Sequence, residues 1–287
     1  MRIHILGNKY AGSGNALRIM EEIKHLLDGY EVTSSFTEKN SENFINYIEK
    51  NSDIKYLITV GGDGTVNYAI QAVAGKNVIL IPVSAGTGSD LARTTGRVKI
   101  SEIPNIISVG KSKRIDLGLI HINGKSRYFI NIMEAGLGGM VMVKVNSIKH
   151  RTGLTFIYAI LSGIIRIRPI ASNIIIDNES LNEKIIDIII ANGQYYGKGI
   201  HASPDSIMDD GFFNVHIIKY MPKIRIFSKL LSLRNGTYID DSYVINRKAK
   251  QINVICNSLI EIDGETENAS SFTVEMCHNM LELFQFP

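Results

Sequence analysis

The chain has 287 residues, a net charge of +3, and 45% hydrophobic against 21% charged residues. This length allows two domains with a sizeable core, and the composition is that of a globular protein whose small net charge gives no support to nucleic-acid binding. The two cysteines, Cys256 and Cys277, lack metal-type spacing and argue against a disulfide scaffold, so we expect reduced thiols in a cytoplasmic protein. Residues 1–6 alternate polar and apolar character, unlike the apolar block of a signal peptide.

The first half of the chain alternates strand and helix patterns. Apolar runs at residues 3–6, 30–36, 56–60 and 78–81 predict strands, and apolar residues at helical spacing follow each of them. Ser41 is the expected N-cap of the second of these helices. This order predicts an α/β domain with a parallel sheet and helices on both faces.

One turn organises this half: Gly61-Gly62-Asp63-Gly64-Thr65, followed by Val66 and Asn67. It lies between a buried strand and a helix, where free backbone N–H groups and the helix dipole favour an anion. Glycine lets a phosphate approach the main chain, and the carboxylate suits a divalent metal that shares the phosphate charge. Glycines kept for turn geometry alone are the alternative, but glycines with an aspartate at this junction favour the phosphate site.

Two further glycine-rich loops follow strands, at residues 7–14 and 82–90. In an open parallel sheet all three loops emerge at the carboxyl ends of the strands, where such folds bind ligands. We therefore expect Asn8, the glycines of both loops and the central turn to face one crevice. No lysine follows the central glycines as a P-loop requires, and residues 7–14 do not fit the dinucleotide fingerprint.

The pattern changes at residues 115–118, and short strands with hairpin signals follow. Hairpin turns are predicted at residues 122–125 and 177–179, and helices near 140–148, 154–167 and 223–233. The candidate strands lie at residues 127–132, 173–176, 185–191, 212–218, 242–245, 251–255 and 259–262. This pattern predicts a β-sandwich-like second domain over residues 119–279, after a first domain over residues 1–118.

Three stretches of the second half have residues suited to chemistry. Residues 192–199 form a glycine-rich loop, and residues 203–212 hold acids and turn residues that suit either an oxygen-ligand metal site or a solvated turn. Residues 261–265 place three acids at the end of a strand, where one can act as a general base. Taken alone, this last stretch is more typical of an exposed hairpin tip.

In their order along the chain, these motifs resemble the diacylglycerol kinase catalytic family, especially its soluble bacterial-type lipid kinases. The central glycine motif is shared with NAD kinases and phosphofructokinases, whereas the end of the next motif, Asp90-Leu91-Ala92-Arg93, points to lipid kinases. The resemblance spans nearly the whole chain. The residues that carry it are 61–67, 85–93, 115–118, 192–193, 203–211 and 262–265.

The resemblance implies ATP-dependent, Mg²⁺-requiring transfer of the γ-phosphoryl group to a lipid hydroxyl. It also implies a fold like that of NAD kinase and diacylglycerol kinase, with the nucleotide between the two domains and a final strand near residues 280–286 that returns to the first. The implied nucleotide contacts are Asn8, Thr37, Gly61, Gly62, Asp63, Gly64, Thr65, Val66, Asn67 and Thr87.

The same resemblance implies roles for residues outside the nucleotide contacts. Asp116 and Asp263 would be active-site acids, with Glu265 the competing candidate for the base. A structural Mg²⁺ site would use the Asp210 carboxylate and the backbone oxygens of Ile207 and Phe212.

The sequence departs from the family pattern at two positions. Lys9 follows Asn8 where the family usually has proline, and Ser89 stands where it usually has asparagine. Two rival functions stay open, a kinase of a soluble nucleotide such as NAD and a nucleotide-binding regulator without catalysis. Retention of Asp63, Asp116 and Asp263 argues against the regulator.

Two apolar stretches bear on the lipid partner. Residues 154–165 are too short to span a bilayer, and a buried core helix is favoured over a membrane-facing or acyl-binding one. Residues 223–234 form a basic amphipathic helix, for which an ordinary surface helix is favoured. Transient contact with a membrane surface and a peripheral location stay open, as does a homodimer.

Overall fold

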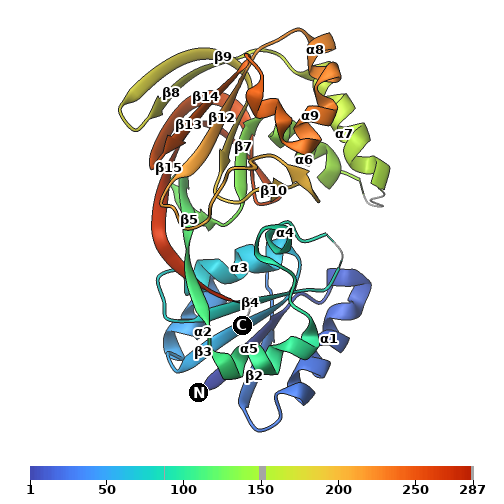
Figure 1. Cartoon of the computed structure of the whole chain (residues 1–287), viewed down its shortest axis with the longest axis vertical. Helices are drawn as coiled ribbons and strands as arrows, with labels where there is room; N and C mark the ends of the chain where they lie inside the picture. Colours follow the sequence, from blue (N-terminus) through green and yellow to red (C-terminus); the bar gives the residue numbers. More distant parts are fainter. Residues whose placement is uncertain (87, 149–152, 286–287) are drawn as a thin grey trace. The chain divides into compact units, whose positions relative to one another are not determined.

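The computed structural model describes residues 1–86, 88–148 and 153–285, and the chain divides into two compact units (Figure 1). Unit 1 comprises Met1–Leu117 with His278–Pro287, and unit 2 comprises Gly118–Cys277. Two strands, β5 (Ser112–Ile122) and β15 (Glu265–Phe284), run from one unit into the other. The sequence placed these transitions after residue 118 and near residue 280.

Unit 1 is built on strands that pair in parallel. Strand β1 pairs with β2 and β3, β3 pairs with β4, and residues Glu282 and Leu283 of β15 pair with β4. Helices α1, α2, α3 and α5 lie around these strands (Figure 1). The elements are β1 (Arg2–Gly7), η1 (Ala11–Gly14), α1 (Asn15–Leu26), β2 (Glu31–Phe36), α2 (Glu42–Lys50), β3 (Ile54–Gly61), α3 (Asp63–Val73), β4 (Ile79–Ser84), α4 (Leu91–Thr95), η2 (Ile100–Glu102) and α5 (Ile103–Val109).

Hydrophobic periodicity explains how unit 1 is packed. Strand β3 is buried almost along its whole length, as expected of a strand covered on both faces. Helix α1 buries Ala16, Ile19, Met20 and Ile23, which recur at helical spacing and form one apolar stripe toward the strands. The packing of unit 1 therefore fixes β3, and with it the point at which the glycine turn begins.

Unit 2 is built on strands that pair antiparallel. Strand β7 lies between β9 and β14, and β14 pairs in turn with β15. Figure 1 shows helices α6 to α9 grouped together beside these strands. The elements are β6 (Lys125–Phe129), β7 (Ile132–Gly136), α6 (Leu137–Asn146), α7 (Gly153–Arg166), β8 (Ile170–Ile176), β9 (Glu179–Ala191), β10 (Tyr195–Tyr196), β11 (Ile200–His201), β12 (Phe213–Lys219), α8 (Lys223–Ser228), α9 (Leu230–Asn235), η3 (Thr237–Asp240), β13 (Val244–Ala249) and β14 (Gln251–Ile262).

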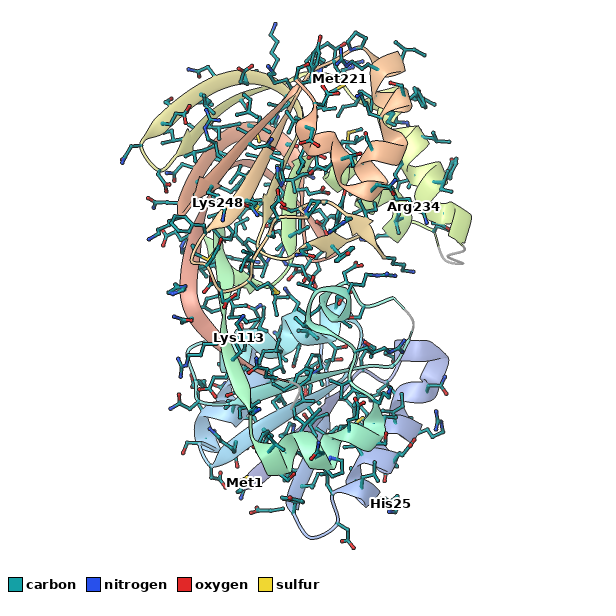
Figure 2. All side chains as sticks on the ribbon, in the orientation of Figure 1. Met1, His25, Lys113, Met221, Arg234 and Lys248 are labelled. Atoms are coloured by element: carbon teal, nitrogen blue, oxygen red, sulfur yellow. The ribbon has the colours of Figure 1, made fainter. Side chains whose placement is uncertain are left out.

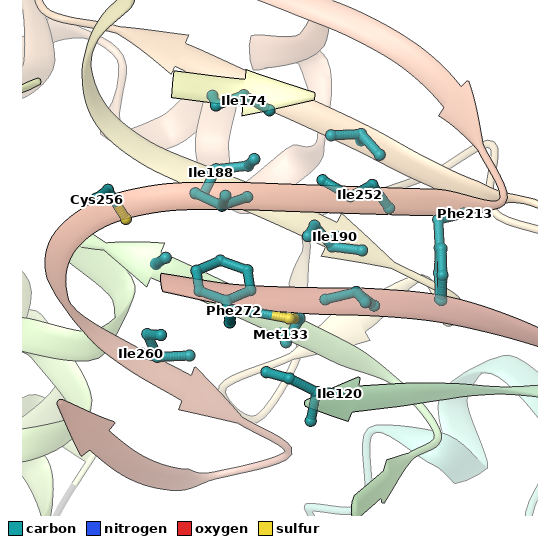
Figure 3. Packing of buried hydrophobic residues seen from close by; sticks show 14 of the residues in the cluster. Ile120, Met133, Ile174, Ile188, Ile190, Phe213, Ile252, Cys256, Ile260 and Phe272 are labelled. Carbon is teal, nitrogen blue, oxygen red and sulfur yellow. The ribbon is translucent and has the colours of Figure 1, made fainter. Parts of the chain in front are cut away.

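Alternating side chains give unit 2 two apolar clusters. One face of the strands contributes Met133, Ile188 and Ile260 to a cluster with Phe213 and Phe272, as Figure 3 shows. The opposite face packs against residues of α6, α7 and α8. Side chains of successive residues therefore enter different environments, which decides the position of several acidic residues described below.

The structure confirms both predicted hairpins and changes the bounds of several predicted elements. Two-residue turns join β5 to β6 at residues 122–125 and β8 to β9 at residues 176–179, with Asn123 and Asp177 at positive φ. The strands predicted at 251–255 and 259–262 are one strand, β14, with a register shift between Ile255 and Ser258. The predicted helix at 223–233 is two short helices, α8 and α9.

The final strand is much longer than predicted, and this corrects the expected bounds of 280–286. It begins at Glu265, directly after the turn that follows β14, and ends at Phe284. Its polar and apolar residues alternate only in part, because most of its length faces partly exposed surroundings. Cross-strand pairing with β14 therefore defines this strand better than its own hydrophobic pattern does.

Candidate functional site

Four strand ends of unit 1 lie side by side at one edge. Gly7 at the end of β1 pairs in register with Phe36 of β2 and Val60 of β3, and Gly61 pairs with Ser84 of β4. The loops that follow these strands therefore start next to one another, at the carboxyl ends where parallel sheets bind ligands. Main-chain contacts join the loops further, since Asn8 N donates to the Val60 carbonyl at 3.0 Å.

The central glycine turn leaves its main chain open beside a helix N-terminus. Gly62 is the N-cap of α3, and a Cβ added at Gly62 or Gly64 would meet no atom within 4 Å. Thr65 is buried, and its Oγ1 has no hydrogen-bond partner among the residues that the structure describes. A phosphate group can approach the uncovered main chain here, where the helix dipole favours its negative charge and the Thr65 hydroxyl can donate to one of its oxygens.

Asp63 ties this turn to the loop after β4. Its Oδ1 accepts hydrogen bonds from Ser89 Oγ at 2.8 Å and Leu91 N at 3.3 Å, and its Oδ2 accepts one from Asp90 N at 3.0 Å. The carboxylate therefore satisfies backbone N–H groups at the start of α4 and is held in a single position. Sequence reasoning did not anticipate this contact, which joins residues of two separate motifs.

Ser89 stands where the family usually has asparagine, and its hydroxyl links Asp63 to the start of α4. Its hydroxyl donates to Asp63 and accepts a hydrogen bond from Ala92 N at 3.2 Å. We expect Ser89→Ala to lower the free energy of unfolding by about 1 kcal/mol, because the Ala92 N–H at the start of α4 loses its acceptor. We also expect it to weaken ATP binding, because Asp63 is less firmly held.

Chemical denaturation and ATP titration of this variant, with Ser89→Asn as the matched control, measure both effects. The asparagine variant keeps an oxygen acceptor and should retain stability and affinity. Equal ATP affinity in wild type and Ser89→Ala would show that the link between the two loops has no part in nucleotide binding.

The remaining predicted nucleotide contacts that the structure describes lie in the loops and helix that follow the strand ends of unit 1. Asn8 Oδ1 accepts a hydrogen bond from Tyr10 N at 3.0 Å, and Thr37 N donates to the Gly7 carbonyl at 2.9 Å. Val66 is buried in the first turns of α3, and the Asn67 carbonyl accepts a hydrogen bond from Gln71 Nε2 at 3.0 Å. Thr87 lies outside the described residues.

Asp116 is a fully buried anchor in β5. Its Oδ1 accepts a hydrogen bond from Asn279 N at 2.7 Å and lies 2.7 Å from His278 Nδ1. Asp116 therefore fixes the start of His278–Pro287, the C-terminal segment that belongs to unit 1. These contacts give its carboxylate a structural role, whatever further role it has in chemistry.

Asp263 is held by a row of backbone donors in unit 2. Its Oδ2 accepts from Ile130 N at 2.8 Å, and its Oδ1 accepts from Asn131 N at 3.1 Å and Ile132 N at 3.3 Å. Its backbone is in the left-handed region, with φ of 46°, as the two-residue turn between β14 and β15 requires. So many donors occupy the lone pairs of the carboxylate, which leaves it poorly placed to take a proton from another molecule.

Glu265 differs from Asp263 in being accessible. Its side chain is 71% exposed, and its Oε2 lies 2.5 Å from Nη1 of Arg127, which is mostly buried. An exposed carboxylate with one cationic partner keeps lone pairs for a substrate hydroxyl. Of the two candidates for the base, Glu265 has the more suitable surroundings.

The predicted metal loop contains a carboxylate that already has partners. Asp210 Oδ1 accepts a hydrogen bond from Phe212 N at 3.0 Å, and Oδ2 lies 2.6 Å from the ammonium group of Lys248. Ile207 is exposed. Figure 2 labels Lys248 on the strands of unit 2. Within the described parts of the chain, no group of three or more His, Cys, Asp or Glu side chains is arranged to hold a metal ion.

Sequence reasoning missed a group of buried acids in unit 2. Glu134, Asp187 and Glu261 come from three neighbouring strands and are almost completely buried. Burial raises the pKa of Glu134 well above its usual range, that of Glu261 to about 8, and that of Asp187 to about 7. Of the three, only Glu261 has a local signal in the sequence, because it lies with two other acids at the end of a predicted strand.

Comparisons with known proteins match both parts of the chain to one family of kinases. Residues 2–120 match the diacylglycerol kinase catalytic domain, and residues 131–285, more than half of the chain, match the YegS C-terminal NAD kinase beta sandwich-like domain. A diacylglycerol kinase of Mycobacterium tuberculosis is 24% identical over 277 residues, which cover 92% of this chain and 88% of that protein.

Two solved structures share the fold. A diacylglycerol kinase from Bacillus anthracis superposes with a TM-score of 0.71 at 18% identity, covering 100% of this chain and 97% of that one. An NAD kinase from Archaeoglobus fulgidus in complex with ATP superposes with a TM-score of 0.57 at 15% identity, covering 99% and 94%. At such identities these two structures support the fold alone. The matches to both parts of the sequence show that the chain belongs to the diacylglycerol kinase catalytic family.

Proposed function

We propose that the protein is an ATP-dependent lipid kinase that transfers the γ-phosphoryl group of ATP to a hydroxyl group of a diacylglycerol-like lipid. The observation that carries this proposal is the turn from Gly61 to Asn67, with open main chain at the N-terminus of α3, in a chain of this family. Phosphoryl transfer needs positioned donors and charge neutralisation more than covalent chemistry, which suits such a turn.

The nucleotide is assigned to unit 1. Gly62 and Gly64 leave room for phosphate oxygens, and the buried Thr65 hydroxyl can donate to one of them. When bound with ATP, Mg²⁺ would supply neutralisation of the phosphate charge. Asp63 would contribute by position, because its carboxylate holds the two loops together through Ser89 and Asp90.

The acceptor alcohol is assigned to acids of unit 2. We propose Glu265 as the general base, because it is exposed and its carboxylate keeps free lone pairs beside Arg127. Glu265 takes the proton of the lipid hydroxyl, the hydroxyl oxygen bonds to the γ-phosphorus, and the bond from that phosphorus to the leaving ADP oxygen breaks. Asp263 then positions the turn, since three backbone donors fix its carboxylate.

The predicted structural Mg²⁺ at Asp210 stays a prediction that the observed contacts do not favour. A metal ion bound there would have to displace the ammonium group of Lys248 from the Asp210 carboxylate. We therefore assign no step of the reaction to an ion at this loop.

Transient membrane contact is assigned to helices α7 and α8. Among the described residues, no helix is both long and apolar enough to cross a membrane. Exposed apolar side chains nevertheless gather on these two helices, which contact each other, and Lys223 Nζ donates to the Ile165 carbonyl between them. Apolar side chains bordered by basic ones suit an anionic lipid surface. The exposed apolar residues are Ile157, Tyr158, Ile165, Ile224 and Phe227.

The activity is tested with labelled ATP and separate acceptors. The purified protein is incubated with Mg²⁺, γ-labelled ATP and either vesicles containing diacylglycerol or NAD in solution. We expect label in a phosphorylated lipid and none in NADP. Label in NADP alone would favour the NAD kinase alternative, to which the shared fold lends support. No transfer to any lipid of a total extract would overturn the proposal.

A further inference from the structure

Three buried carboxyl groups lie on one face of the strands of unit 2, beneath the start of α6. Met133, Ile188 and Ile260 point into the apolar cluster on the opposite face (Figure 3). Because side chains alternate along a strand, their neighbours Glu134, Asp187 and Glu261 point the other way, toward α6. Glu134 is completely buried and the other two are almost so.

Strand register brings two of these acids directly opposite each other. Glu261 of β14 pairs with Glu134 of β7, whereas Asp187 of β9 pairs with Gly136 and so lies two residues further along. Directly opposed residues of an antiparallel pair have Cβ atoms about 4.5–5.5 Å apart. The carboxyl groups of Glu134 and Glu261 are therefore close neighbours in a region without water-exposed surface.

The surroundings provide few donors to these carboxyl groups. The Gly138 N–H of α6 donates to Asp187 Oδ2 at 2.9 Å, and the Gly264 N–H donates to Glu261 Oε1. In the described part of the chain, Glu261 Oε2 and Asp187 Oδ1 meet no donor at hydrogen-bond geometry, whereas the Tyr196 hydroxyl interacts with the Glu134 carboxyl group as a hydrogen-bond donor. Two opposed buried carboxylates with so few donors repel each other, so at least one of them has to hold a proton.

The start of helix α6 covers the carboxyl group of Glu134. A Cβ added at Gly138 would lie 1.6 Å from Glu134 Oε2, so only a glycine allows the helix backbone to rest directly on the carboxyl group. A cavity of about 40 Å³ beside the helix is lined by Asp187 and Tyr196 among others. This cavity has room for a water molecule beside Asp187.

The titratable groups that face the pair come from five elements. They are Asp187 of β9, Tyr196 of β10, Tyr238 of η3, Arg127 of β6 and Asp263 of the turn after β14. Arg127 is the one cation among these five. It favours the ionised form of Glu261, but burial and the neighbouring Asp263 act more strongly in the opposite direction.

We propose that Glu134 and Glu261 share one proton and together position the turn that carries Asp263 and Glu265. Protonated Glu134 donates to Glu261 Oε2, while Glu261 Oε1 accepts from the Gly264 N–H in the turn. Both carboxyl groups are then satisfied, and the turn is fixed to the centre of unit 2. Glu134 and Glu261 are positioning residues, and their effect on catalysis rests on the proposed lipid kinase function.

The sign of the pH effect follows from the raised pKa values. Unfolded glutamate ionises near pH 4.5, whereas Glu261 ionises at about 8 in the folded protein and Glu134 well above its usual range. Between these values the folded protein holds protons that the unfolded chain has lost. Stability is therefore greatest below about pH 4.5 as far as this pair is concerned, and it falls as the pH rises toward 8 and beyond.

Glu134→Gln tests the pair, because glutamine keeps the shape and a donor but cannot titrate. The logarithm of the unfolding equilibrium constant is measured by chemical denaturation from pH 5 to pH 9. The matched control is Glu267→Gln, a half-buried residue of β15 whose Oε1 accepts a hydrogen bond from Asn123 Nδ2 at 2.7 Å, because glutamine keeps this acceptor. We expect the slope against pH to fall by about one in Glu134→Gln, because each retained proton contributes about tenfold per pH unit, and to stay unchanged in the control.

The second measurement is the pH profile of lipid phosphorylation. In the wild type the pair keeps the shared proton on Glu134 after Glu261 ionises, so kcat should fall on the alkaline side of pH 8, when Glu134 also loses its proton and the turn is released. This alkaline fall should move to higher pH in Glu134→Gln. If that variant does not fold, Glu261→Gln is measured in the same two ways. An unchanged stability slope in a folded variant would overturn the shared proton, even if the protein phosphorylates no lipid. An altered slope with an unchanged kcat profile would overturn the positioning role.

Discussion

Replacing Glu265 with glutamine is expected to lower kcat for lipid phosphorylation about 10²- to 10⁴-fold, the usual contribution of a general base. The side chain is exposed, and its one described cationic partner is Arg127. Glutamine has the same shape but cannot take a proton from the acceptor hydroxyl. Binding of ATP should persist, because its proposed contacts lie in unit 1, in a different part of the chain. Steady-state kinetics with labelled ATP and an ATP titration measure the two effects separately.

Two further variants make this result specific. Glu267→Gln, two residues along the same strand, is the matched control and should keep full activity. Asp263→Asn keeps the shape of the turn but weakens the three hydrogen bonds from residues 130–132, so it should lower both activity and stability. A Glu265→Gln variant with normal activity would reassign the base, and loss of activity in Asp263→Asn without loss of stability would favour Asp263.

Replacing Gly61 with alanine is expected to destabilise unit 1 and to remove ATP binding. An added Cβ would lie 2.0 Å from Oγ1 and 2.6 Å from Cβ of Thr65. Thr65 is buried in the first turn of α3, so rotation of its side chain cannot relieve the second contact and the helix start has to move. We expect a loss of about 1–3 kcal/mol in the free energy of unfolding, as for other overpacked sites.

Gly62→Ala is the matched control for stability. Its added Cβ meets no atom within 4 Å, and its φ of −115° is accessible to any residue. Chemical denaturation of both variants, together with ATP titration of Gly61→Ala, is the measurement. Equal stability of the two variants, or normal ATP affinity in Gly61→Ala, would show that the geometry of this turn is not needed for nucleotide binding.

Local pattern was enough to predict much of the fold. The alternation of apolar strands and helical stretches located β1, β3, β4 and the helices after them, and the Asn123-Gly124 turn predicted the first hairpin of unit 2. These features depend on residues within a few positions of one another, whose backbone preferences and burial pattern leave few alternatives. The long strand β15 was predicted only at its end, because its pairing with β14 determines it more than its own residues do.

The chemistry of individual residues required the tertiary structure. Sequence patterns were enough to predict the glycine turn, the resemblance to the family and a short set of candidate acids. Only the folded chain separates Asp263, fixed by the amides of residues 130–132, from the accessible Glu265 two positions away. Alternation along β14 places Glu261 opposite the apolar face, which by itself predicts a solvated side chain. In the folded chain, Glu261 is instead buried beneath helix α6 and lies opposite Glu134, which favours the protonated form of its carboxyl group. The neighbours of a carboxyl group are brought to it by strand register and packing, so its environment cannot be read from the local sequence.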